Sequence, residues 1–295
     1  MRSFIYQAPT SVKEAVALLA DTSIKTRPLA GGTDLLVQLR HHLVEADLLV
    51  DVKRIPELNR ISFDPAKGLT IGAAISCAAL CEHPDVQRLY PGLIDAVSII
   101  GGAAIQGRAT LGGNLCNAAP SADSIPAMIV LDGTCSIDGP TGIRTVPVQA
   151  FCTGPGEIVL GKGEILVSIH LPAPAPNSGA CYTRFTPRRE MDIAVAGAGV
   201  WIVLSDDHAK ITDARVALAS VAPTPLLVQS ANAALTGKPP TEETFAEAAK
   251  LAEQAAHPIT DVRGTKAQRR HLAGVLVKRA LRGAVQRAKG GSING

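Results

Sequence analysis

The pattern of hydrophobic and polar positions at the start of the chain predicts a strand–helix–strand unit. Ser11 and Glu14 precede apolar residues at helical spacing and form a capping box, in which each side chain accepts a hydrogen bond from the other's free backbone N–H. Strand, helix and strand over so short a span predict a parallel or mixed sheet. The expected elements are a helix over about 12–20, a strand near 27–30, the turn Gly31-Gly32, a helical run with Leu35, Leu36, Leu39 and Leu43, and a strand over 48–52.

A second unit is expected from about residue 57 up to a proline-rich segment at 172–179. Repeated proline blocks both helix formation and strand pairing, so we expect a linker there and a domain boundary after residue 177. The elements expected before it are a strand over 69–73, helical material over 78–100, a glycine-rich stretch over 101–113, a helix over 123–131, and strands over 134–137, 145–148 and 165–171.

Beyond the linker, long strands give way to helices. Asp206-Asp207 is expected to form a hairpin turn, and Gly237 to end a helix. The strands are expected over 180–186, 193–204 and 211–221, and the helices over 226–235, 242–256 and 266–288. The simplest arrangement is a three-stranded antiparallel sheet with helices packed on one face. The pattern as a whole predicts an α+β protein, with subdomains at about 1–56 and 57–177 and a C-terminal domain at 178–295.

Composition narrows the kinds of partner. Only 3% of residues are aromatic, so a binding site here is expected to use backbone and small side chains rather than aromatic stacking. The net charge of +3 is too balanced for nucleic-acid binding across the surface, and no recognisable nucleic-acid-binding module is present. The basic excess lies in residues 266–289. We expect this helix to expose Arg269, Arg270, Arg279 and Arg282 to water. The alternatives are docking on an acidic partner subunit and, as a lesser one, docking on a membrane surface.

Cysteine spacing bears on redox chemistry, and hydropathy bears on where the protein is located. The six cysteines contain no Cys-x-x-Cys pair, which argues against a disulfide framework and against an iron–sulfur cluster held by this chain alone. No run of about 18 apolar residues predicts a transmembrane segment, and the N-terminus lacks the apolar core of a signal peptide. A cytoplasmic location is expected.

Two glycine-rich turns are the most informative candidates for chemistry. In Ala30-Gly31-Gly32-Thr33-Asp34, missing side chains and successive N–H groups suit an anion such as phosphate, although such a turn also serves chain geometry alone. The second is Thr110-Leu111-Gly112-Gly113-Asn114. Downstream, Ser121 and Asp123 can hydrogen-bond a polar ligand or cap the following helix. Rossmann, Walker, zinc-protease and serine-hydrolase motifs are absent from the sequence.

These two motifs together resemble the FAD-binding subunit of the xanthine dehydrogenase and aerobic carbon monoxide dehydrogenase family of molybdenum hydroxylases. A pair of such motifs about eighty residues apart is far more specific than either alone. The resemblance spans essentially the whole chain. Its further matches are Pro120, Glu164-Ile165-Leu166, the segment Arg188-Arg189-Glu190-Met191-Asp192-Ile193-Ala194, and Arg263-Gly264 with Arg269-Arg270-His271-Leu272-Ala273.

The resemblance implies a PCMH-type FAD-binding domain of two α/β subdomains, followed by a C-terminal domain. The first turn would wrap the FAD pyrophosphate with backbone amides, and the second would line the diphosphate and ribityl portion. Asp123 would hydrogen-bond the adenosine side, and Leu166 would make an apolar contact. Arg184 and Ile193 stand where some relatives carry a lysine and a tyrosine near the flavin. The matched cofactor positions are Leu29, Ala30, Gly31, Gly32, Thr33, Asp34, Thr110, Leu111, Gly112, Gly113, Asn114, Asp123, Leu166 and Arg184.

The resemblance also implies a role in electron transfer. FAD would take electrons from a 2Fe-2S small subunit and pass them to NAD, quinone or oxygen, while a molybdenum-cofactor large subunit would hold the substrate. No catalytic residue and no metal site are expected in this chain. Two alternatives stay open: a self-sufficient flavin oxidase of the vanillyl-alcohol-oxidase type, and an adaptor that keeps the fold without flavin. The absence of histidine from residues 1–40 speaks against the first, because that class often tethers flavin to a histidine near this turn.

Overall fold

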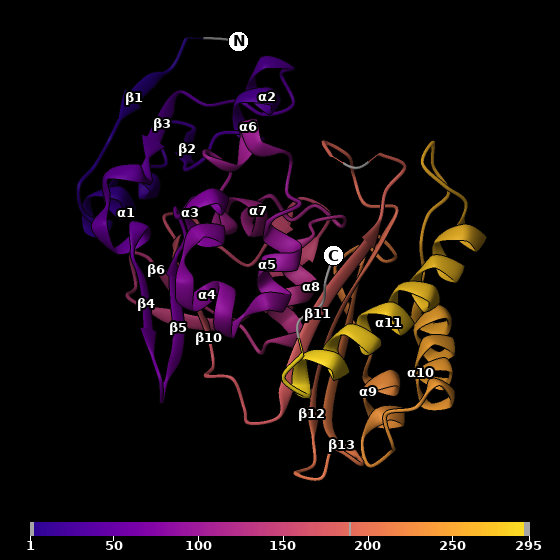
Figure 1. The fold of residues 1–295 in the computed structure, drawn as a ribbon. Coiled ribbons are helices and arrows are strands. Elements are labelled where there is room, and N and C mark those ends of the chain that lie inside the picture. Colours follow the sequence, from indigo (N-terminus) through magenta and orange to yellow (C-terminus); the bar gives the residue numbers. More distant parts are fainter. Residues whose placement is uncertain (1–2, 189, 292–295) are drawn as a thin grey trace.

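The computed structural model describes residues 3–188 and 190–291 (Figure 1). Along the chain, a small parallel sheet is followed by an antiparallel sheet with short helices, and then by a long-stranded sheet flanked by long helices. Arg189 of the family segment and residues 292–295 of the expected C-terminal domain lie outside the described residues. Within the described part, no helix is both long enough and apolar enough to span a membrane.

The N-terminal sheet is parallel, with strand order β1-β3-β2. At its carboxyl edge Leu29 of β2 stands opposite Asp51 of β3. The pattern did not predict β1, because its three residues are exposed and show no buried face. The elements are β1 (Ile5–Gln7), α1 (Val12–Ala20), β2 (Thr26–Leu29), α2 (Leu35–Arg40), β3 (Leu48–Asp51) and the 3-10 turns η1 (Val52–Arg54) and η2 (Pro56–Asn59).

The two N-terminal helices differ from expectation at their ends. Ser11 Oγ accepts a hydrogen bond from the Glu14 N–H, but the Glu14 carboxylate accepts from the Thr10 N–H instead of the Ser11 N–H. Only one of the two hydrogen bonds expected of the capping box is therefore present. Helix α2 ends at Arg40, because His42 adopts a left-handed φ of 57°. Leu43 consequently lies outside the helix and is 73% exposed.

The central unit is a five-stranded antiparallel sheet in the order β4-β5-β10-β6-β7. Its strands are β4 (Ile61–Asp64), β5 (Gly68–Gly72), β6 (Thr134–Asp138), β7 (Arg144–Pro147) and β10 (Ile165–Leu171), and β8 (Cys152–Gly154) pairs separately with β9 (Glu157–Ile158). The expected strands 69–73, 134–137, 145–148 and 165–171 are present, whereas β4, β8 and β9 were not predicted.

Short helices surround this sheet. The helical material expected over 78–100 is divided into three helices, because Pro84 and Pro91 each start a new one and cannot continue the helix before them. The six cysteines, several of which lie in this unit, are all free thiols. The helices are α3 (Cys77–Glu82), α4 (Pro84–Leu89), α5 (Pro91–Val97), α6 (Ala103–Gln106), α7 (Leu111–Asn117), α8 (Ser124–Val130) and the 3-10 turn η3 (Val148–Ala150).

The C-terminal sheet is antiparallel in the order β11-β12-β13-β14. The three expected strands are present, and a fourth of two residues is added where helix was expected to begin at 226. Asp207 closes the turn between β12 and β13 by accepting hydrogen bonds from Ser205 Oγ and the Ala209 N–H. The elements are β11 (Ser178–Phe185), β12 (Ala196–Leu204), β13 (Ile211–Ala219), β14 (Leu226–Leu227), α9 (Gln229–Leu235), α10 (Glu242–Ala255) and α11 (Lys266–Ala288).

The C-terminal helices pack on one face of this sheet, as expected, and α8 of the central unit covers the other face. Ala198, Val200 and Ile202 of β12 point into a core shared with α9, α10 and α11. The alternate residue Gly199 faces α8, where an added Cβ would lie 3.0 Å from the Pro126 carbonyl oxygen. Figure 1 shows α10 and α11 on one side of the strands and the central unit on the other. Residues 172–177, between the central unit and the C-terminal sheet, form no helix or strand. The domain limits 1–56, 57–177 and 178–295 stay predictions.

The basic helix α11 is not a uniformly solvated face. Arg270, Arg279 and Arg282 are exposed, but Arg269 is only 4% exposed, so the expectation that it faces water was wrong. Its guanidinium donates to the Val195 and Ser220 carbonyl oxygens and pairs with Asp261 at 2.7 Å. Buried cations are kept where hydrogen bonds replace water. Arg269 therefore ties the helix to the chain beside β12 and β13.

Candidate functional site

The two glycine motifs lie against the same part of the central unit. A Cβ added to Gly31 would lie 2.2 Å from the Arg108 carbonyl oxygen, two residues before Thr110. A Cβ added to Gly112 would lie 2.5 Å from the Ala73 carbonyl oxygen, which accepts the Gly112 N–H at 3.2 Å. Only glycine permits backbones to approach so closely. The fold therefore joins the first turn to the segment that opens the second.

The first turn leaves the carboxyl edge of the parallel sheet. Gly32 has a left-handed φ of 79°, which glycine adopts without strain. In the described residues, no hydrogen-bond acceptor is recorded for the backbone N–H groups of Gly31, Gly32 and Thr33. Leu29 anchors the turn in the core, Ala30 is half-buried, and Asp34 is exposed and does not cap α2 with its side chain. Successive unpaired N–H groups on half-buried residues are the donor set of an anion site.

The second turn is a capped helix start. Thr110, 2% exposed, accepts the Gly113 N–H on its hydroxyl at 2.9 Å and so caps α7. Leu111 is fully buried beneath it. Asn114 Oδ1 accepts a hydrogen bond from Ser124 Oγ at 2.6 Å, which links the start of α7 to the start of α8. The motif is thus held rigid by contacts within its own unit.

Asp123 and Arg184 come together across the two halves of the chain. Arg184 donates to Asp123 Oδ2 at 2.6 Å, and the Tyr182 hydroxyl donates to Oδ1 at 2.8 Å. Burial raises the pKa of Asp123, while the Arg184 charge and the hydrogen bonds act to lower it. Neither Ser121 nor Asp123 caps α8 with its side chain, so the capping interpretation was wrong. The buried carboxylate instead binds two side chains of β11.

Leu166 and Ile193 occupy different environments. Leu166 lies on β10, is 3% exposed and packs in the hydrophobic core of the central unit. Ile193 is 45% exposed, in the loop between β11 and β12. In that loop the Met191 N–H donates to the Gly101 carbonyl oxygen at 3.1 Å, so the loop contacts the glycine-rich stretch before α6. The structure therefore brings the family segment to the central unit, but it buries Leu166.

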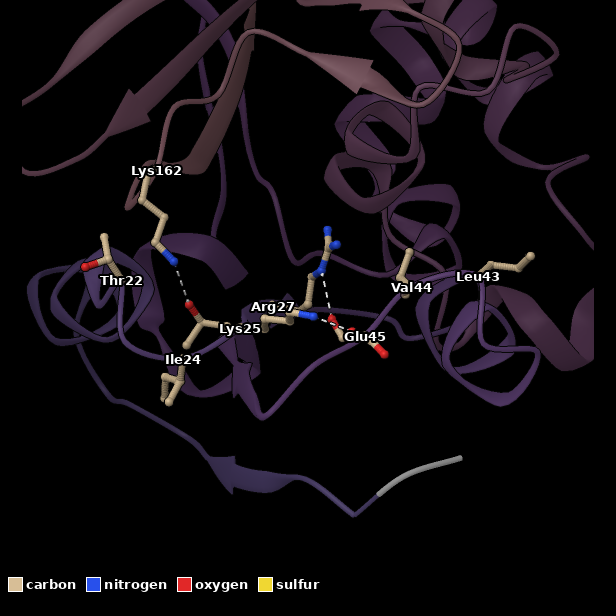
Figure 2. Close-up of a pocket in the computed structure, with 9 residues that line it drawn as sticks. Thr22, Ile24, Lys25, Arg27, Leu43, Val44, Glu45 and Lys162 are labelled. Atoms are coloured by element: carbon tan, nitrogen blue, oxygen red, sulfur yellow. Dashed lines mark hydrogen bonds and ion pairs between the residues drawn. The ribbon is translucent and has the colours of Figure 1, made fainter.

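Two cavities lie away from these residues. One of about 500 Å³ (Figure 2) is crossed by hydrogen bonds from Lys162 Nζ to Thr26 Oγ1 and from Arg27 Nε to the Glu45 carbonyl oxygen. The other, of about 310 Å³, lies beside the proline-rich segment and includes Tyr90. No residue predicted to bind the cofactor lines either of them. The candidate site is thus described by the contacts between the motifs.

Sequence reasoning missed several residues that build the site. Ala73 and Arg108 supply the carbonyl groups on which the glycines pack, and Tyr182 completes the Asp123 contacts. None of the three stands in a motif, and each is brought to the site by a contact distant in sequence. A short side chain at Ala73 beside a motif glycine is a signal only once the fold is known.

Comparison with known proteins bears on the whole chain. The family described as the FAD binding domain in molybdopterin dehydrogenase matches residues 2–174, and the CO dehydrogenase flavoprotein C-terminal domain matches residues 181–284. The putative xanthine dehydrogenase FAD-binding subunit of Escherichia coli (strain K12) is 35% identical over 97% of each chain. The carbon monoxide dehydrogenase medium chain of Hydrogenophaga pseudoflava is 34% identical over 95% of this chain and 96% of its own.

The chain is also similar to solved structures over nearly its whole length. A chain of the carbon monoxide dehydrogenase from Hydrogenophaga pseudoflava superposes with a TM-score of 0.92 at 35% identity, over 97% of this chain and 98% of that one. A chain of quinoline 2-oxidoreductase from Pseudomonas putida 86 does so with a TM-score of 0.90 at 31% identity, over 97% and 98%. This chain therefore belongs to the FAD-binding subunits of the molybdenum hydroxylases, a family of oxidoreductases.

Proposed function

We propose that the chain holds FAD where its two glycine motifs meet and acts as the electron-transfer subunit of a molybdenum hydroxylase. Electrons would come from a 2Fe-2S small subunit and go to NAD, quinone or oxygen, while a molybdenum-cofactor large subunit would act on the substrate. Bound FAD supplies the redox chemistry, and the chain supplies its position and electrostatic surroundings. The cytoplasmic location expected from the sequence stays a prediction.

The observation that carries the proposal is the run of N–H groups at Gly31, Gly32 and Thr33 beside Arg108, for which the described part of the chain supplies no acceptor. Three neutral donors in a half-buried turn suit the phosphate oxygens of a dinucleotide. The second motif can line the site of the same ligand without rearranging, because its helix cap and its contact with α8 are formed in the absence of a ligand. The residues present therefore fit FAD.

The residues proposed to contact FAD differ in how their side chains are already engaged. Residues 30–34 would bind the diphosphate through backbone amides, and Thr110, Gly113 and Asn114 would line the next portion. Both Asp123 oxygens already accept hydrogen bonds, but each keeps a second lone pair for the adenosine side. Arg184 would act through Asp123, which it binds directly. Burial leaves Leu166 little surface for an apolar contact.

Similarity to a xanthine dehydrogenase FAD-binding subunit over 97% of this chain does not favour the self-sufficient oxidase. Purification from the native host, followed by an absorption spectrum, a denaturing gel and metal analysis, tests the proposal. We expect a flavin band with iron–sulfur absorption, two further polypeptides, and molybdenum. A lone yellow polypeptide that oxidises small alcohols unaided would refute it in favour of the oxidase, and a colourless one in favour of the adaptor.

A further inference from the structure

Lys53 and Arg108 are two cations that lie next to the glycine motifs. Lys53 Nζ donates to the Ala74 carbonyl oxygen at 2.9 Å, and Arg108 Nε donates to the Gly31 carbonyl oxygen at 3.3 Å. Both acceptors are neutral, and no ion pair of Lys53 or Arg108 is recorded among the residues that the structure describes. Within the described part of the chain, no carboxylate therefore forms an ion pair with either cation, although the Asp51 charge acts on Lys53.

The sheet register explains how both cations reach this place. Asp51 ends β3 opposite Leu29, so Lys53 follows that strand just as the glycine turn follows β2. The carboxyl edge of a parallel sheet is where such folds bind ligands. The ammonium group then crosses to Ala74, the neighbour of the Ala73 on which Gly112 packs. Lys53 thus connects the surroundings of both glycine motifs.

The charges around Lys53 add to this geometry. Burial is the main cause that lowers its pKa, and the nearby Arg108 guanidinium lowers it further, while Asp51 opposes both. Asp51 is itself engaged, because it accepts hydrogen bonds from the Tyr6 hydroxyl and the Lys53 N–H. Two like charges in a partly desolvated place repel each other, and an anion between them would relieve this repulsion.

We propose that Lys53 and Arg108 form a cation pair that binds the diphosphate of the flavin dinucleotide, in addition to the backbone amides of the turn. The assignment rests on the proposed function and extends it, because amides alone are neutral donors. Neutral donors give an affinity that depends little on salt, whereas two cations make the affinity fall as ionic strength rises. The pair therefore gives a signature that a purely backbone site lacks.

The test is a fluorescence titration of the flavin-free full chain with FAD at low and high ionic strength. We expect Lys53→Gln and Arg108→Gln each to weaken binding roughly three- to tenfold at low salt, the size expected of a partly exposed charge pair. Each variant should also show a smaller salt dependence. Lys67→Gln is the matched control: it removes the same charge in the exposed turn between β4 and β5, away from the first glycine turn, and should bind like the wild type.

Charge-conserving variants separate this role from structural damage. Lys53→Arg and Arg108→Lys should keep both the affinity and its salt dependence, and circular dichroism identifies any variant that fails to fold. If folded Lys53→Gln and folded Arg108→Gln both bind FAD with wild-type affinity and salt dependence, the cation-pair assignment is overturned but the proposed function is not. A wild-type chain that binds no FAD at any salt concentration would overturn the proposed function, and the assignment with it.

Discussion

At the scale of single residues, the glycines of the first motif do two different jobs. Gly32 supplies a left-handed backbone, whereas Gly31 has no such need and is instead pressed against the Arg108 carbonyl group. A methyl group at Gly31 cannot avoid that contact, since the obstacle is backbone rather than the end of a flexible side chain. The close contact between the two motifs therefore requires that residue 31 has no Cβ atom.

Gly31→Ala is expected to destabilise the protein and to lower flavin retention. Its Cβ would lie 2.2 Å from the Arg108 oxygen, so the turn must shift away from the second motif. Overpacking of this kind costs about 1–3 kcal/mol and here displaces the site itself. Thermal melting and the ratio of bound flavin to protein measure the two effects.

Gly107→Ala is the control for that substitution. Gly107 is the residue before Arg108, has an ordinary helical φ of −66°, and an added Cβ would meet no atom within 4 Å. We expect unchanged flavin content and a stability equal to or slightly above that of the wild type. Equal stability of Gly31→Ala and Gly107→Ala would contradict the contact with Arg108.

At the scale of elements, the central sheet is tied together by an ion pair across one of its strands. Glu164 precedes the middle strand β10 and receives two hydrogen bonds from Arg144 of the edge strand β7, each of 2.7 Å. The Gly161 N–H donates to the same carboxylate at 2.7 Å. These contacts hold the loop before β10 against the edge strand β7.

This ion pair predicts a pH dependence. The Arg144 hydrogen bonds are the main cause that lowers the pKa of Glu164 below its ordinary 4.5. A depressed carboxyl pKa stabilises the fold above the unfolded value, and this is lost as pH falls through the folded value. Glu164→Gln should therefore be less stable than the wild type at pH 7, with the difference shrinking below 4.5.

Denaturant titration of Glu164→Gln at several pH values measures this difference. Arg144→Gln removes the other partner, so the double variant should lose little more stability than either single variant. A difference that stays constant from neutral to acid pH would show that the Glu164 charge has no stabilising role.

At the scale of the whole molecule, the two halves are joined through buried polar contacts as well as apolar packing. Tyr182 and Ala217 of the C-terminal sheet belong to the core of the central unit. Asp95 of α5 pairs with Arg287 of α11 and accepts the Tyr182 N–H, while Arg287 also donates to the Ala180 carbonyl oxygen. These groups satisfy the free edge of β11, which would otherwise be open to pairing.

Asp95→Asn and Arg287→Met are each expected to lower the free energy of unfolding by about 1–3 kcal/mol. Each leaves a poorly solvated charge of the other residue without its partner. The double variant should recover part of the sum, as measured by urea denaturation in a double-mutant cycle. Arg282, which lies on α11 like Arg287, forms an exposed ion pair with Glu242 of α10, and Arg282→Met should have a much smaller effect. Strictly additive losses at Asp95 and Arg287 would contradict the coupling.

The features that the sequence alone determined are those set by neighbours along the chain. Helix α11 has the predicted bounds because apolar spacing and the Thr265 cap are local, and β10, β12 and β13 were predicted because each is rich in apolar residues along its own length. The glycine motifs were recognisable for the same reason, since turn chemistry resides in consecutive residues. Their family resemblance then indicated the cofactor, which the comparisons with known FAD-binding subunits support.

Only the tertiary structure decided the features that depend on distant partners. Strands β1 and β14 are too short to show a period, and they form because a neighbouring strand offers its edge. Arg269 is buried because the carbonyl groups of Val195, before β12, and Ser220, after β13, accept its hydrogen bonds. A helical pattern in the sequence cannot reveal acceptors on another element. The contacts that assemble the candidate site, Gly31 on Arg108 and Asp123 with Arg184, join residues 77 and 61 positions apart. Periodicity cannot encode such contacts, because they arise from the packing of whole elements.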